Sequence, residues 1–212
     1  PEAEIRQAMV DSETPAQVIE YNYFARHFEH VVAKYLTVLG TNLSGVVNFE
    51  DRLALNYLRA RPDVDAENVA CMGLSGGGAR AGLLRATADD LKAAVVVGMM
   101  STYPGLLDHH IESHTWMFFP AGWARFGDWP DLVACQAPAP LLVQYDLDDD
   151  LFTPEGMHSA HERLQAHYAS VGAPTSYTGQ FYPGPHKFDV EMQAAAFQWL
   201  KDKLESRKPT LV

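Results

Sequence analysis

The sequence has few cysteines, a deficit of positive charge and no long apolar run. Its 212 residues include two cysteines, and 16 lysines and arginines stand against 27 acidic residues, which gives a formal net charge of −11. Nucleic-acid phosphates would repel such an acidic chain, so we expect no nucleic-acid partner. The longest apolar run, Ala93 to Met100, is far shorter than the roughly 18 residues of a membrane span, and we expect none.

The cysteines and histidines do not suggest a redox or metal centre. Cys71 lies in an apolar run typical of a buried strand, which favours a free, unreactive thiol; a disulfide with Cys135 is the alternative. His109 and His110 are adjacent, and neighbouring side chains on a helix point apart, so they make a poor chelating pair. We therefore expect no metal, no cofactor and a soluble protein, whose location, cytoplasmic or secreted, stays open.

Short apolar segments alternate with segments of helical periodicity. The strands are expected at residues 67–74, 92–100, 139–145 and 175–184, and the helices at residues 15–39, 48–61, 77–90, 154–172 and 188–204. Strands that are apolar throughout and separated by helices predict an α/β fold with a mostly parallel sheet flanked by helices. We expect one domain over residues 1–212. The stretch from about 101 to 131 is rich in aromatics and histidines and breaks the alternation, which suggests a lid-like insertion.

One short glycine-rich motif suggests a catalytic serine. Residues 73–77 read Gly-Leu-Ser-Gly-Gly, which fits G-x-S-x-G between a predicted strand and a predicted helix, the context of a nucleophile elbow. Positions 73 and 77 are expected to require glycine, because a Cβ at either position would collide in the tight turn. Gly78 is expected to serve helix packing. Ser75 is then the candidate nucleophile, and the Gly76 N–H is the candidate oxyanion donor. The alternative is a glycine-rich turn with a capping serine.

A serine nucleophile needs a base and an orienting acid, and both candidates follow later strands. The third predicted strand runs into acidic residues at positions 146, 148, 149 and 150. Several acids after a strand usually form a solvated loop, so we expect one of them to point inward. His186 lies in a turn before the last helix, and the other histidines fall on helical or lid segments. This gives the order serine, acid, histidine.

These segments resemble the α/β-hydrolase superfamily, and within it the esterases related to acetyl xylan esterases and dienelactone hydrolases. The similar stretches read CMGLSGGG, AAVVVGMMSTY, HTWMFFPAG, APAPLLVQYDLDDDLFTPEGM and YPGPHKFDVEMQAAAFQWL, within roughly residues 45–205. The resemblance implies a Ser75–His186–Asp149 triad, with Asp150 as the second choice for the acid. Asp146 takes the place of a family glycine. His114 and Trp116 match a family stretch, and we expect a structural role for them.

The chain also departs from the family. Dienelactone hydrolases use a cysteine nucleophile, and Ser75 favours ordinary ester hydrolysis instead. The family has several strands before the elbow, and a loop among them supplies the second oxyanion donor. Only a doubtful strand-like run, residues 35–40, precedes this elbow, and the chain does not begin with Met. We therefore expect the N-terminal strands to be missing, so that the chain is the C-terminal two-thirds of the domain.

The sequence predicts a serine carboxylic-ester hydrolase that acts on short-acyl or acetyl esters, with a small-molecule ester as its substrate. A prolyl-oligopeptidase-type peptidase is one alternative, because it shares the elbow. A non-catalytic, hydrolase-like binding module is the other, because part of the oxyanion hole is expected to be missing. A homo-oligomer, or association with the missing N-terminal segment, would cover the exposed edge of a shortened sheet.

Overall fold

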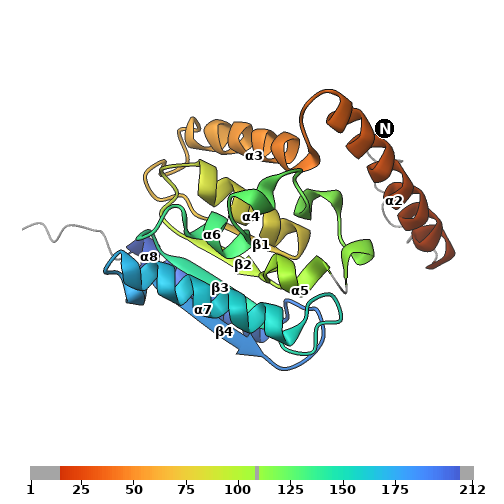
Figure 1. The fold of residues 1–212 in the computed structure, drawn as a ribbon. Coiled ribbons are helices and arrows are strands. Elements are labelled where there is room, and N and C mark those ends of the chain that lie inside the picture. Colours follow the sequence, from red (N-terminus) through yellow and green to blue (C-terminus); the bar gives the residue numbers. More distant parts are fainter. Residues whose placement is uncertain (1–14, 108–109, 206–212) are drawn as a thin grey trace, which may run out of the picture. The chain divides into compact units, whose positions relative to one another are not determined.

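The structure, a computed structural model, describes residues 15–107 and 110–205, and the chain divides into two compact units after Thr41 (Figure 1). In the first unit the described element is helix α2 (Pro15–Val38). The strand-like run at residues 35–40 is the end of this helix and the turn after it, where Gly40 has a φ of 76°.

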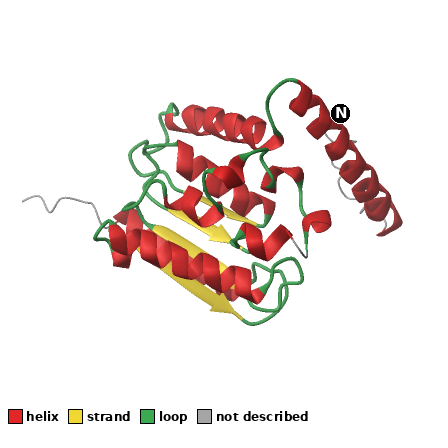
Figure 2. Ribbon diagram, viewed as in Figure 1, coloured by secondary structure: helices red, strands yellow, loops and turns green. Residues whose placement is uncertain are grey.

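The second unit contains a parallel sheet, as the sequence predicts (Figure 2). Its strands are β1 (Cys71–Leu74), β2 (Ala94–Val97), β3 (Leu141–Asp146) and β4 (Tyr177–Tyr182), in the spatial order β1-β2-β3-β4. In register, Val97 pairs with Leu74 on one side and with Gln144 on the other. Because all four strands run the same way, the segments that follow them begin at one edge of the sheet.

Helices connect and cover the strands (Figure 1). They are α3 (Leu43–Arg59), α4 (Gly76–Thr87), α5 (Tyr103–Leu107), α6 (Trp129–Ala134), α7 (Pro154–Ser170) and α8 (Val190–Glu205). Helix α3 begins earlier than its periodicity predicts, because the Asn42 side chain caps it by accepting from Gly45 N at 2.9 Å. Across the described ranges, no helix is both long and apolar enough to cross a membrane.

The two faces of the sheet have separate apolar cores. Val96 and Val143 face the side covered by α4, α6 and α7, whereas Val97 and Leu142 face α8. All four side chains are fully buried. Burial of each such side chain is worth roughly 1.5–3 kcal/mol, which explains why these strands are continuously apolar. The predicted α/β architecture is confirmed.

The segment at residues 101–131 contains α5, the short 3-10 helices η1 (Ile111–Ser113), η2 (Trp116–Phe118) and η3 (Trp123–Arg125), and the start of α6. Its centre is anchored in the core. The carbonyl oxygen of buried Phe118 accepts from the Tyr103 hydroxyl at 3.0 Å and from Trp129 Nε1 at 3.2 Å. The Ser44 hydroxyl donates to Met117 O at 2.7 Å, which ties the segment to α3.

Helix α4 packs closely against the sheet at Gly78. A Cβ at this position would lie 2.8 Å from Met99 Cγ and 2.9 Å from Val97 O, closer than real Cβ atoms come. The expected packing role of Gly78 is thus confirmed. At Gly77, one residue earlier, a Cβ would meet no atom within 4 Å.

These contacts predict different effects for two alanine substitutions. Gly78→Ala should lower the free energy of unfolding by roughly 1–3 kcal/mol, because the methyl group overpacks the contact between α4 and β2. Gly77→Ala should leave it unchanged or raise it by up to about 1 kcal/mol, because alanine favours the helix. Urea unfolding followed by circular dichroism measures both, and equal destabilisation by the two variants would contradict this packing.

Candidate active site

Ser75 occupies a one-residue turn between β1 and α4. Its φ of 56° and ψ of −121° make it the one non-glycine residue with positive φ in the described part of the chain. Its N–H donates to Val97 O at 2.8 Å, and its carbonyl accepts from Ala79 N at 3.0 Å. Such a conformation costs about 1–3 kcal/mol and persists only where the surrounding structure enforces it, most often at functional sites.

The steric expectation for the elbow is correct on one side of Ser75 and wrong on the other. A Cβ on Gly73 would lie 2.0 Å from Gly77 O, so residue 73 must be glycine. Gly77 itself has open space at its Cβ position, because it takes part in the close contact through its carbonyl group and not through its Cα. The turn therefore requires glycine at position 73 and not at position 77.

Gly76 is the first residue of α4, and its N–H lies at the positive end of the helix dipole. The first N–H groups of a helix have no partner within it. Here Ala79 N is the donor that bonds back to Ser75 O. A Cβ at Gly76 would be 3.8 Å from Met117 Cε, so the buried Met117 covers the beginning of the helix.

Asp149 and His186 form a direct pair. His186 Nδ1 donates to Asp149 Oδ2 at 2.7 Å, and Leu151 N donates to the other oxygen, Oδ1, at 2.9 Å. The Asp149 side chain is 1% exposed, whereas Asp150 lies at the surface. Of the two acids that the sequence proposes, the structure brings Asp149, and not Asp150, to His186.

The loops that carry these two residues are joined by further hydrogen bonds. Asp148 N donates to Gly184 O at 3.1 Å, and Gly184 N donates to Asp148 Oδ2 at 2.7 Å. Lys187 N donates to Asp146 Oδ2 at 3.1 Å. The segment after β3 thus holds the segment after β4 on both sides of His186.

The hydrogen bond that His186 donates to the Asp149 carboxylate is the main reason that the pKa of His186 is raised above its usual value. Burial opposes this effect, and the charges of Asp149 and Asp146 add to it. An acid in this position stabilises the protonated imidazole.

Ser75 and His186 both lie next to the end of β2. Ser75 N bonds to Val97 O, and His186 Cε1 is 3.1 Å from the Cβ position of Gly98, the next residue. Among the described residues, no hydrogen bond joins the Ser75 hydroxyl to His186. In proteins without substrate, catalytic hydrogen bonds are often long and tighten only when the reactant binds.

His114 belongs to the 101–131 segment and contacts the loop that carries Asp149. Its Nε2 donates to Leu151 O at 2.9 Å, and its ring packs against Phe118 and Phe152 with centroid distances of 5.0 and 4.9 Å. Burial lowers the pKa of His114, so this ring is mainly neutral near pH 7. These contacts agree with a structural role for His114.

The ligand atoms of one group of side chains are spaced closely enough to hold a metal ion. Asp146, Asp149 and His186 each place a donor atom within 4.8 Å of the others. His186 Nδ1 carries the proton that it donates to Asp149, so this nitrogen has no lone pair to offer a cation. We therefore describe the group as a carboxylate pair around a hydrogen-bonded histidine.

Cys71 and Cys135 are free thiols, and burial raises the pKa of Cys71 to about 12, so this thiol is unreactive.

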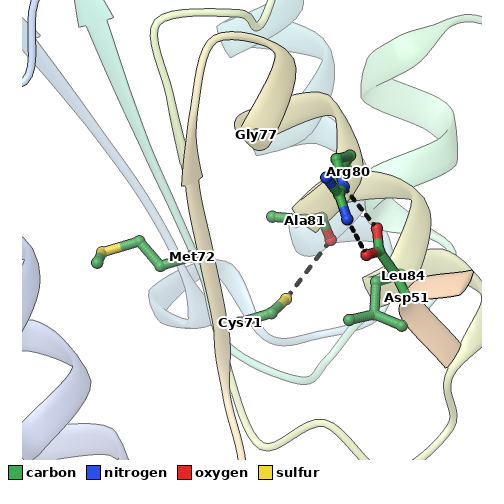
Figure 3. A pocket seen from close by; sticks show the side chains of 7 residues that line it. All are labelled: Asp51, Cys71, Met72, Gly77, Arg80, Ala81 and Leu84. Atoms are coloured by element: carbon green, nitrogen blue, oxygen red, sulfur yellow. Dashed lines mark hydrogen bonds and ion pairs between the residues drawn. The ribbon is translucent and has the colours of Figure 1, made fainter. Parts of the chain in front are cut away.

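A pocket of about 270 Å³ lies beside the elbow, on the α4 side of β1 (Figure 3). Its lining consists of Asp51, Cys71, Met72, Gly77, Arg80, Ala81 and Leu84. Arg80 makes a bidentate ion pair with Asp51, in which Nε donates to Oδ2 at 3.0 Å and Nη2 donates to Oδ1 at 2.5 Å. Cys71 and Met72 point to opposite sides of β1. Ser75 and His186 do not line this pocket, so we do not assign it to the reaction.

Comparison with known proteins finds similarity to hydrolases. No family model matches the chain. A protein of Bacillus subtilis (strain 168) named "Putative hydrolase YtaP" is 26% identical over 156 residues, which cover 70% of this chain and 50% of that protein. The chain thus spans half the length of this curated relative.

Solved structures show the same fold. A CE15 glucuronoyl esterase from Caldicellulosiruptor kristjansonii aligns with a TM-score of 0.62 at 16% identity, covering 77% of this chain and 50% of that one. A "putative acetyl xylan esterase" from Bacteroides fragilis aligns with a TM-score of 0.66 at 17% identity, covering 84% and 53%. The acylaminoacyl peptidase of Pyrococcus horikoshii aligns at 0.54 and 17%, covering 77% and 29%. The chain has the α/β-hydrolase fold.

The Asp149–His186 pair predicts how His186 titrates. Asp149→Asn removes the carboxylate that raises the pKa of His186, so the imidazole should lose its proton at lower pH than in the wild type. Asp150→Asn removes an exposed acid of the same loop and serves as the control. NMR titration of the histidine ring signals measures both, and an unchanged His186 midpoint in Asp149→Asn would contradict the pairing.

Proposed function

We propose that this protein is a serine carboxylic-ester hydrolase that works through an acyl-enzyme. The observation that carries the proposal is the strained turn at Ser75, placed next to the pair of buried Asp149 and half-buried His186 at the same edge of the sheet. A hydroxyl in such a turn, with a base oriented by an acid nearby, is the arrangement that acyl transfer to serine requires. The esterases among the structural neighbours support this choice of chemistry.

Acylation begins when His186 takes the proton of the Ser75 hydroxyl. Because Nδ1–H is engaged by Asp149, the lone pair that accepts this proton is on Nε2. The Ser75 oxygen attacks the ester carbonyl and forms a tetrahedral intermediate. As that intermediate collapses, Nε2–H protonates the leaving alcohol, and the acyl group stays on Ser75.

Deacylation repeats these steps with water. His186 Nε2 removes a proton from the water, the hydroxide attacks the acyl carbonyl, and the Ser75 oxygen leaves with the proton returned from Nε2. Asp149 keeps the imidazole in the Nδ1–H tautomer and stabilises its positive charge in both transition states, without itself taking the proton.

The Gly76 N–H is the proposed oxyanion donor. It lies at the start of α4, where the helix dipole favours a negative charge, and directly follows the nucleophile. One such donor is worth roughly 3 kcal/mol of transition-state stabilisation.

The proposed substrates are small esters with short acyl groups, acetyl esters above all. The glucuronoyl esterase and the acetyl xylan esterase among the neighbours are named for carbohydrate esters, which fits a small acyl or alkyl group on a polar partner. The peptidase neighbour makes amide hydrolysis the activity to compare.

A fluorophosphonate probe tests the nucleophile. It should form one covalent adduct, on the peptide that contains Ser75. Ser75→Ala should abolish the adduct and lower the rate of ester hydrolysis by a factor of about 10³ or more. Ser159→Ala removes an exposed serine of α7 and serves as the control. A folded full-length protein that forms no Ser75 adduct would instead be a non-catalytic member of the fold.

A series of p-nitrophenyl esters tests the substrate class. We expect kcat/KM to be highest for acetate or butyrate and to fall as the acyl chain lengthens. An N-acyl amino-acid p-nitroanilide, measured alongside, reports peptidase activity. A maximum at long acyl chains would contradict the short-acyl proposal, and faster turnover of the anilide would favour the peptidase.

A further inference from the structure

Asp146 is a buried acid that the mechanism above leaves unused. It is the last residue of β3 and is 1% exposed. Its Oδ2 accepts from Lys187 N at 3.1 Å, while its Oδ1 is buried with no hydrogen-bond partner among the described residues. A buried carboxylate with one unsatisfied oxygen costs stability, which suggests that a carboxylate here serves the site and not the fold alone.

The surroundings of Asp146 are those of the proposed catalytic site. A Cβ on Gly98 would lie 3.1 Å from both Asp146 Oδ2 and His186 Cε1, so the carboxylate and the imidazole flank the same backbone position. Gly98 has a φ of 56°, and the absence of a side chain there lets both groups approach.

The bond to Lys187 makes Asp146 an anchor for the histidine segment. Lys187 directly follows His186, so its N–H fixes the backbone on one side of the imidazole, and Asp149 fixes the ring itself. The Lys187 side chain does not compete for this carboxylate, because its ammonium pairs with Asp189 at 2.8 Å.

The charges around this group couple the titration of its members. Burial raises the pKa of Asp146, and the charge of Asp149 adds to that, whereas the Lys187 N–H and the positive charges of His186 and Lys187 lower it. In return, the charge of Asp146 helps to raise the pKa of His186. The charge of His186 also helps to lower the pKa of His114. A second carboxylate thus favours the protonated imidazole, alongside Asp149.

We propose that Asp146 is a positioning residue of this site, one that holds the His186 segment through the Lys187 N–H and places a second acid beside the Asp149–His186 pair. The proposal rests on the proposed esterase function. It assigns two separable effects to one carboxylate, since the hydrogen bond needs an acceptor oxygen and the electrostatic effect needs a charge.

Two substitutions separate these effects. Asp146→Asn keeps an acceptor for Lys187 N–H and removes the charge, whereas Asp146→Ala removes both. With p-nitrophenyl acetate, Asp146→Asn should retain kcat at the pH plateau to within about threefold, and the acid limb of its kcat/KM profile should move to lower pH. Asp146→Ala should lose kcat on the order of tenfold to a hundredfold, because small displacements of a catalytic group are costly.

NMR titration of His186 gives a readout that does not depend on activity. In Asp146→Asn the imidazole should deprotonate at lower pH than in the wild type, and Asp150→Asn should leave it unchanged. An unmoved His186 midpoint in Asp146→Asn would overturn the proposal, and so would equal plateau rates for Asp146→Ala and Asp146→Asn. If the wild type hydrolyses no ester while the His186 midpoint still falls, the esterase proposal fails and the coupling of Asp146 to His186 stands.

Discussion

The backbone conformation of Ser75 is the constraint on which the site depends. Its left-handed φ is held by the bond from its N–H to Val97 O and by the helix that starts from its own carbonyl. It is permitted by the missing side chain at Gly73, whose Cβ would collide with Gly77 O. The turn thus keeps Ser75 beside the end of β2, where the loops after β3 and β4 bring the other two residues.

Parallel pairing explains why residues so distant in sequence meet. The strands β1 to β4 lie in chain order and run in one direction, so the segments after each begin at the same edge. Asp149 and His186 are 37 positions apart yet hydrogen-bonded, because β3 and β4 are neighbours whose following segments bond to each other through Asp148 and Gly184. The rigid sheet holds the loops, and the loops hold the side chains.

The sequence predicted the strands and the elbow well, because continuous apolar runs favour buried strands and a serine among glycines after such a run favours a tight turn. The resemblance favoured Asp149 over Asp150, and the structure pairs Asp149 with His186. The residues alone do not separate the two, since adjacent acids in a loop differ only in which way the chain turns them. The motif assigned a steric need to Gly77 that only Gly73 has, because spacing does not reveal which backbone atoms touch. Asp146 stood out only as a departure from a family glycine, since its bond to Lys187 N depends on two separate loops.

Acylation of Ser75 is the step on which the proposed function depends, and trapping the acyl-enzyme detects it. The full-length protein is mixed with p-nitrophenyl acetate, quenched in acid within the first turnover and mapped by peptide mass spectrometry. We expect an acetyl group on the peptide that contains Ser75, formed together with the first equivalent of p-nitrophenol and absent from Ser75→Ala. An active protein whose acetyl group sits elsewhere, or that releases product with an unmodified Ser75 throughout, would contradict the proposed function.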